Sequence, residues 1–117
     1  MASHDPVAHP GSTIAELTHK LTSFILVCIH TILYHRRLYP PATFLTTRAY
    51  DHPVAQSRHP AVCRWVRDAI AALDAQLLRP KDGAAAAGGW VERAVLVVFS
   101  DAAEVMERYV FDLAGLP

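Results

Sequence analysis

TIAELTHKLTSFILVCIHTILYHRRL, residues 13–38, contains the most apolar stretch of the chain, residues 24–33, and has the spacing of a helix. Thr13 and Glu16 are spaced as a capping box, which favours a helix start at Thr13. Residues 24–29 are all apolar, so this part of the helix is expected to be covered on more than one side. The pattern predicts one long central helix over residues 13–38, ended by Pro40 and Pro41. The apolar positions that set the helical period are Ile14, Leu17, Leu21, Phe24, Cys28 and Ile32.

A second helix is predicted over residues 61–78, because His59-Pro60 places proline at its favoured first position. The spacing predicts a buried stripe of Val62, Val66, Ala69, Ile70, Leu73 and Leu77. Four charged residues are predicted to face water: Arg64, Arg67, Asp68 and Asp74.

Residues 91–113 predict an antiparallel hairpin. Residues 94–99 form a continuous apolar run, which is typical of a strand covered on both faces, and a turn is predicted at residues 101–104. The strand that follows alternates between two faces, one with Val105, Tyr109, Phe111 and Leu113, the other with Met106, Arg108, Val110 and Asp112.

The remaining segments connect these elements. Residues 42–58 are predicted to be a polar connection that could include a short strand, and residues 81–89 a surface loop. Helices followed by a hairpin indicate a single α+β domain of layered helices and strands.

Charge argues against a protein held mainly by phosphate contacts, because 11 basic and 11 acidic residues cancel. One alternative stays open, namely a small nucleic-acid-binding domain that uses a basic face between residues 36 and 67. That stretch has Asp51 as its one acid against six arginines: Arg36, Arg37, Arg48, Arg58, Arg64 and Arg67.

No catalytic motif is evident in the sequence. The seven histidines form no HExxH pattern, and neither a phosphate loop nor a G-x-S-x-G motif is present, so we expect no enzyme activity, metal or cofactor. His30 is interpreted as a core histidine bonded to backbone, and His59 as ordering the turn before the second helix. Cys28 and Cys63 are expected to be buried thiols in a reducing compartment. Residues 24–33 are too short to span a bilayer, so no membrane partner is expected.

Three segments together resemble the HORMA-domain family. Residues 31–44 (TILYHRRLYPPATF) resemble the ILY-x-R-x-x-YPP-x-x-F signature, residues 50–68 resemble the stretch that leads into the second helix, and residues 91–113 resemble the central hairpin. The resemblance implies a HORMA-like α+β fold with a long central helix and a second helix packed on an antiparallel sheet. Family members run to about twice this length. We therefore expect residues 1–11 to be a flexible tail and residues 12–117 the N-terminal half, incomplete at its C-terminal end and without the mobile safety belt.

The resemblance also implies a function. One branch of the family contains the accessory subunit of translesion DNA polymerase zeta, a nuclear adaptor between the catalytic subunit and a scaffold polymerase. A second branch acts in the spindle checkpoint. Residues 58–61 (RHPA) are more similar to the first branch, and residues 40–44 (PPATF) and 107–112 (ERYVFD) fit both. By position, Trp65 and Tyr39 match aromatics near the site for the partner peptide, although ordinary helix packing also explains both.

Overall fold

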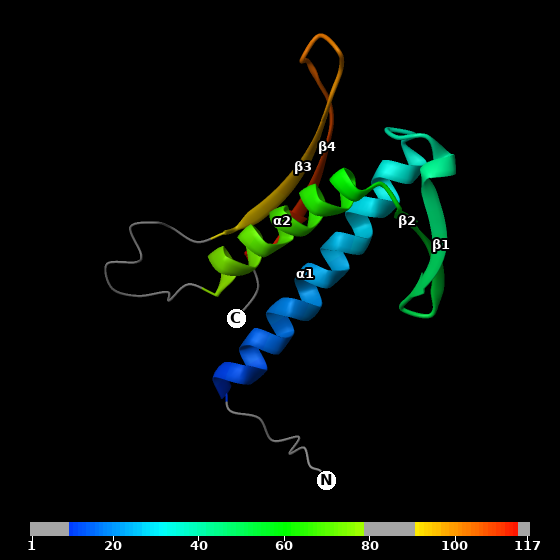
Figure 1. Ribbon diagram of the computed structural model, residues 1–117. Helices are drawn as coiled ribbons and strands as arrows, with labels where there is room; N and C mark the ends of the chain where they lie inside the picture. Colours follow the sequence, from blue (N-terminus) through cyan, green and yellow to red (C-terminus); the bar gives the residue numbers. More distant parts are fainter. Residues whose placement is uncertain (1–9, 79–90, 115–117) are drawn as a thin grey trace.

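The computed structural model describes residues 10–78 and 91–114, and it confirms an α+β fold in which two helices cross and two separate hairpins flank them (Figure 1). The loop predicted at residues 81–89 lies outside the described residues. In chain order the elements are α1 (Pro10–His35), a 3-10 turn (Pro41–Thr43), β1 (Phe44–Ala49), β2 (His52–Ser57), α2 (Pro60–Leu77), β3 (Arg93–Phe99) and β4 (Val105–Asp112).

Helix α1 is the predicted central helix, but both predicted ends were wrong. It begins at Pro10, so Thr13 lies inside the helix and is not its cap. At the other end Arg37 has a φ of 54°, its N–H bonds to Tyr34 O, and the Leu38 N–H bonds to Leu33 O at 3.1 Å. This pair of bonds is a Schellman motif, which ends the helix at His35 before the prolines are reached.

The connection predicted over residues 42–58 is a complete hairpin, with β1 and β2 paired from Phe44↔Ser57 to Ala49↔His52. Tyr50 and Asp51 form its two-residue loop, and both have positive φ, 54° and 66°. Two such residues match the right-handed twist of the strands they join, as in a type I′ turn. Arg48 donates from its guanidinium to Asp51 O at 2.9 Å, which ties the loop to the strand before it.

Helix α2 confirms the predicted start, because His59 is its N-cap and Pro60 its first residue. The Ala61 N–H donates to His59 Nδ1 at 3.1 Å, so this histidine orders the turn as expected. Val62 and Val66 are buried. Asp74 was predicted to face water, but its side chain is only 19% exposed. Its carboxylate accepts a 2.8 Å hydrogen bond from the Thr22 hydroxyl of α1 and therefore links the two helices.

The predicted hairpin of residues 91–113 is confirmed as β3 and β4, which pair from Arg93↔Asp112 to Phe99↔Val105 with an irregularity after Val98. The expectation that both faces of β3 are covered was wrong. Val95 and Phe99 are 38% and 59% exposed, because two strands alone have one covered face and one open face.

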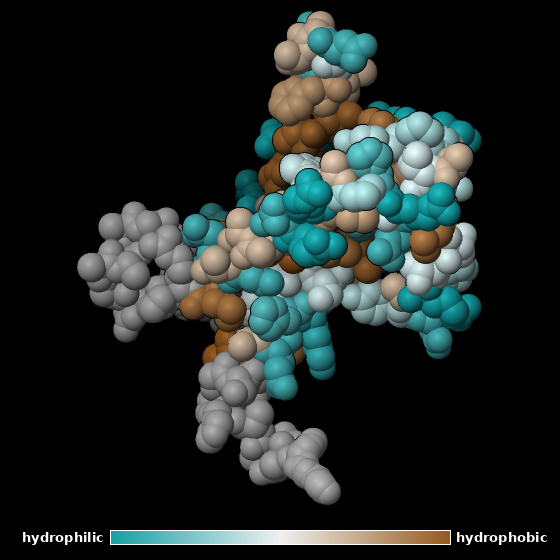
Figure 2. Space-filling model, in the orientation of Figure 1, coloured by the Kyte–Doolittle hydropathy of each residue, from teal (hydrophilic) through white to brown (hydrophobic). Residues whose placement is uncertain are grey.

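The core lies where α1, α2 and the end of β4 meet. One stripe of α1 packs on α2 there, and the last residue of the predicted hairpin closes the cluster. Its buried members are Ile25, Ile29, Leu33, Val62, Val66 and Leu113. Hydrophobic side chains also reach the surface along the hairpin drawn at the top of the molecule (Figure 2).

Helix α1 has a second property that the apolar run of residues 24–33 does not reveal by itself. By length and composition, its segment Ile14–His35 is long and apolar enough to cross a membrane. A core helix of a soluble protein passes the same test, and α1 does contribute to the core. The absence of a membrane partner stays a prediction.

Candidate functional site

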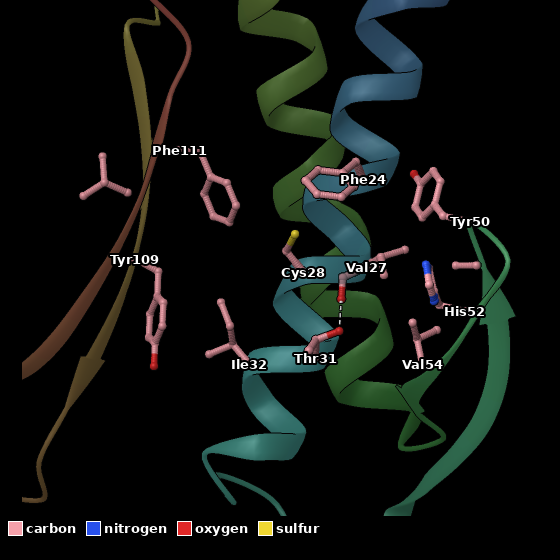
Figure 3. Close-up of a pocket in the computed structure, with 12 residues that line it drawn as sticks. Phe24, Val27, Cys28, Thr31, Ile32, Tyr50, His52, Val54, Tyr109 and Phe111 are labelled. Carbon is pink, nitrogen blue, oxygen red and sulfur yellow. Dashed lines mark hydrogen bonds between the residues drawn. The ribbon is translucent and has the colours of Figure 1, made fainter.

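An apolar groove of about 480 Å³ runs along the side of α1 that faces away from α2 (Figure 3). The floor is one stripe of α1, because residues three and four apart share a helix face. Hairpin β1–β2 forms one wall and strand β4 the other. The floor consists of Phe24, Val27, Cys28, Thr31 and Ile32, and the walls of Ala49, Tyr50, His52, Val54, Tyr109, Val110 and Phe111.

Aromatic rings shape both walls. Tyr50 lies edge-on to Phe24 with ring centroids 5.6 Å apart, so the tip of the β1–β2 hairpin is held against α1. Tyr109 and Phe111 stand on the opposite side, at alternate positions of β4 (Figure 3). Most of the lining side chains are aliphatic or aromatic, which favours an apolar occupant.

A polar contact ties β4 to the end of α1. Glu107 Oε1 accepts from the Arg36 guanidinium and, at 2.7 Å, from the Tyr109 hydroxyl. The two hydrogen bonds lower the pKa of Glu107, and the bond to the carboxylate raises the pKa of Tyr109. All three groups are solvated, so we expect the contact to orient the hairpin more than to stabilise the fold.

His30 confirms its predicted role and joins α1 to the β1–β2 hairpin. Its ring is 4% exposed, and Nδ1 accepts from the Ser57 N–H at 3.1 Å. Ser57 O in turn accepts from the Cys63 thiol at 3.0 Å, and the Ser57 hydroxyl accepts from the His59 N–H. Burial lowers the pKa of His30, which keeps the ring neutral and able to accept.

The two cysteines are free and only partly buried, so the expectation of buried thiols holds in part. Cys28 is partly covered because it lies in the groove floor. Burial still raises its pKa, which makes the thiolate scarce and the group unreactive. Within residues 10–78 and 91–114, no group of three or more His, Cys, Asp or Glu could hold a metal ion.

Trp65 and Tyr39, the predicted partner-peptide residues, both reach solvent. Trp65 is 51% exposed on α2, and Tyr39 is 39% exposed after the end of α1. Neither belongs to the groove lining, so the structure separates them from that surface. Their role in peptide binding stays a prediction.

Sequence reasoning missed the groove and the Arg36–Glu107 contact. The available signal was the breadth of the apolar face of α1, which exceeds what α2 alone covers. The pairing of Arg36 with Glu107, 71 residues apart, has no local signal.

No protein-family profile matches the chain. Individual relatives do match. The DNA polymerase zeta processivity subunit of Schizosaccharomyces pombe is 35% identical over 94 residues, which cover 80% of this chain and 40% of that protein. The mitotic spindle assembly checkpoint protein MAD2B of Gallus gallus is 30% identical over 92% of the chain and 45% of its own length. MAD2A of Dictyostelium discoideum is 31% identical over 97% and 49%.

The fold has a solved counterpart. A chain of a crystal structure of the mitotic checkpoint complex superposes with a TM-score of 0.71 at 20% sequence identity, over 85% of this chain and 48% of that one. The chain thus spans less than half the length of the relatives it matches. It is a homologue of the DNA polymerase zeta processivity subunit and of the MAD2 proteins, and its fold belongs to the HORMA-domain family.

Proposed function

We propose that the chain is part of a HORMA adaptor that serves as the accessory subunit of DNA polymerase zeta. It is not an enzyme in this proposal. It acts in the nucleus and grips short peptides of the catalytic subunit and of a scaffold polymerase. The observation that carries the proposal is the identity with the processivity subunit of Schizosaccharomyces pombe over four fifths of the chain.

The sheet topology supports peptide binding by strand addition. Each of the two sheets has two strands among the described residues, so every strand has one edge that no other described strand pairs. Such edges offer backbone N–H and C=O groups to an extended peptide, while side-chain pockets supply specificity. Trp65 lies within reach of solvent on α2, where an aromatic ring can act as an anchor for a partner.

A spindle-checkpoint role is the second candidate, because several relatives bear that name. The two roles predict different peptides. Parallel titrations with peptides from the polymerase zeta catalytic subunit and from checkpoint proteins distinguish them, because specificity is a difference between two affinities.

The nucleic-acid alternative gains little from the structure. Two of the six arginines of the basic face already have acidic neighbours, since Arg36 bonds to Glu107 and Arg48 lies 3.6 Å from the Asp51 carboxylate. These acids partly neutralise the face. Binding of duplex DNA that is strong and falls steeply with salt, without any protein partner, would restore this alternative.

Replacing Trp65 with alanine is expected to weaken binding of the polymerase zeta peptide by more than about 1 kcal/mol, because a buried aromatic anchor contributes far more than its neighbours. Isothermal titration calorimetry measures the change in an extended form that carries the belt segment expected from the family. Phe99→Ala is the matched control, since Phe99 is 59% exposed on the β3–β4 hairpin. Equal binding by Trp65→Ala and the unsubstituted form would show that Trp65 does not bind the peptide and serves only in helix packing.

A second test concerns the belt segment expected from the family. The 117-residue chain alone is expected to bind the same peptide weakly or not at all, because a belt that wraps the peptide slows its release. Tight binding by this chain alone would show that no belt is needed. The same titrations with Tyr39→Ala test the second predicted residue.

A further inference from the structure

Two histidine rings hold the junction where the chain leaves β2 and enters α2 beside α1 (Figure 1). His30 of α1 accepts a hydrogen bond from the Ser57 N–H at 3.1 Å, and His59 accepts one from the Ala61 N–H at 3.1 Å. The accepting atom is Nδ1 in both rings, so each bond exists only while its ring is neutral. Protonation makes Nδ1 a donor that faces another donor.

Ser57 connects the two histidines. The residue is 2% exposed, and its N–H donates to His30. Its hydroxyl accepts from the His59 N–H at 3.1 Å, and its carbonyl accepts from the Cys63 thiol at 3.0 Å. One polar group of Ser57 therefore bonds to α1 and two bond to the start of α2. In a buried network the hydrogen bonds support one another, so the loss of one weakens the others.

The other ionisable groups near this junction do not compensate for a charge on His30. Cys63 contributes a thiol and Tyr34, one turn further along α1, a phenol, and both kinds of group stay neutral in acid. Arg58, next to Ser57, is exposed and positive. Among the described residues no carboxylate forms an ion pair with His30. The Asp74 carboxylate instead lies 3.3 Å from His19, where acid strengthens the contact between the helices.

We propose that the β2–α2 junction is an acid-sensitive switch, in which protonation of His30 and His59 releases Ser57 and frees the first turn of α2 from α1. Burial lowers the pKa of His30, so the closed junction excludes a proton that the open junction binds. A charge on His59 also opposes the positive N-terminal end of the α2 dipole. Trp65 lies in the next turn of α2, so opening loosens its support whether or not the ring binds a peptide.

Hydrogen exchange of the 117-residue chain, followed for single amides by NMR, tests the switch. After correction for intrinsic exchange rates, protection of the Ser57 N–H is expected to fall about tenfold between about pH 7.5 and pH 5.5, because opening takes up a proton. Protection of Ser57 and Ala61 is also expected to stay below that of Ile29 and Leu33 in the core of α1, because the junction opens without the rest of the fold. Protection that does not fall, or that equals the protection of the core amides, would overturn the proposal.

Substitutions assign the effect to the two rings. Asparagine offers an acceptor that does not titrate, and it is a favoured N-cap residue. His30→Asn is expected to reduce the fall at Ser57, His59→Asn the fall at Ala61, and the double variant to abolish both. His59 is exposed, so its variant is expected to retain the fold. His19→Asn is the matched control, because it removes a histidine of α1 that lies outside the junction. A fall that persists in the double variant, or that the control reduces equally, would contradict the switch.

Discussion

Replacing Leu33 with alanine is expected to lower the free energy of unfolding by about 2–5 kcal/mol, because the residue is fully packed and its loss leaves a cavity. Leu33 is 4% exposed and belongs to the cluster that joins α1 to α2 and β4. Urea unfolding followed by circular dichroism measures the difference. Leu17→Ala on the same helix is the control, since Leu17 is 55% exposed. A Leu33→Ala loss no larger than that of the control would mean that α1 is not the centre of the core.

Replacing His30 with alanine is expected to cost a similar amount, about 2–4 kcal/mol, because it leaves the Ser57 N–H without an acceptor as well as creating a cavity. The ring is buried and its Nδ1 is the acceptor for that N–H. His30→Asn retains an acceptor near the same position, so it is expected to lose less than His30→Ala. Equal losses in the two variants would show that the hydrogen bond contributes nothing beyond packing. The same urea experiment supplies both values.

His30 also gives stability a dependence on pH. Burial lowers its pKa below the ordinary value of 6.5, so the unfolded chain binds a proton at a higher pH than the folded chain does. Stability is therefore full above about pH 6.5 and falls as pH drops toward the lowered pKa of the folded state. His30→Asn is expected to flatten this decline between about pH 7 and pH 5. An unchanged slope in His30→Asn would assign the decline to other groups.

The elements with local signals were predicted well. The His59-Pro60 pair marks the start of α2, because proline suits the first helical position and the histidine side chain accepts from the Ala61 N–H. The buried place of His30 followed from its apolar neighbours. The β3–β4 hairpin followed from the apolar run and the alternation after it.

Other features form without the residue types or the local pattern that usually indicate them. The loop of the β1–β2 hairpin uses Tyr50 and Asp51 at positive φ, where Asn-Gly or Asp-Gly is the usual sign. Arg37 takes the left-handed position that ends α1, which glycine usually occupies. The bond from Thr22 to Asp74 joins residues 52 apart, so no local pattern indicates it.

Some residues of the candidate site could be predicted from the sequence, and others could not. Trp65 and Tyr39 were predicted through family resemblance, and the structure adds only that both are accessible. The groove was not found, because its floor and walls come from three segments that meet only in the folded chain. A stripe on α1 is visible in the sequence, but which side of it stays open depends on where α2 packs.

The most direct test of the proposed adaptor function is purification of the tagged protein, as its own gene encodes it, from the cells that express it. Quantitative mass spectrometry then identifies what accompanies it, with Trp65→Ala as the matched variant. The proposal predicts that the catalytic subunit of polymerase zeta co-purifies and that its amount falls in the variant. Recovery of spindle-checkpoint proteins without that subunit, while the tagged protein is folded and abundant, would contradict the proposal.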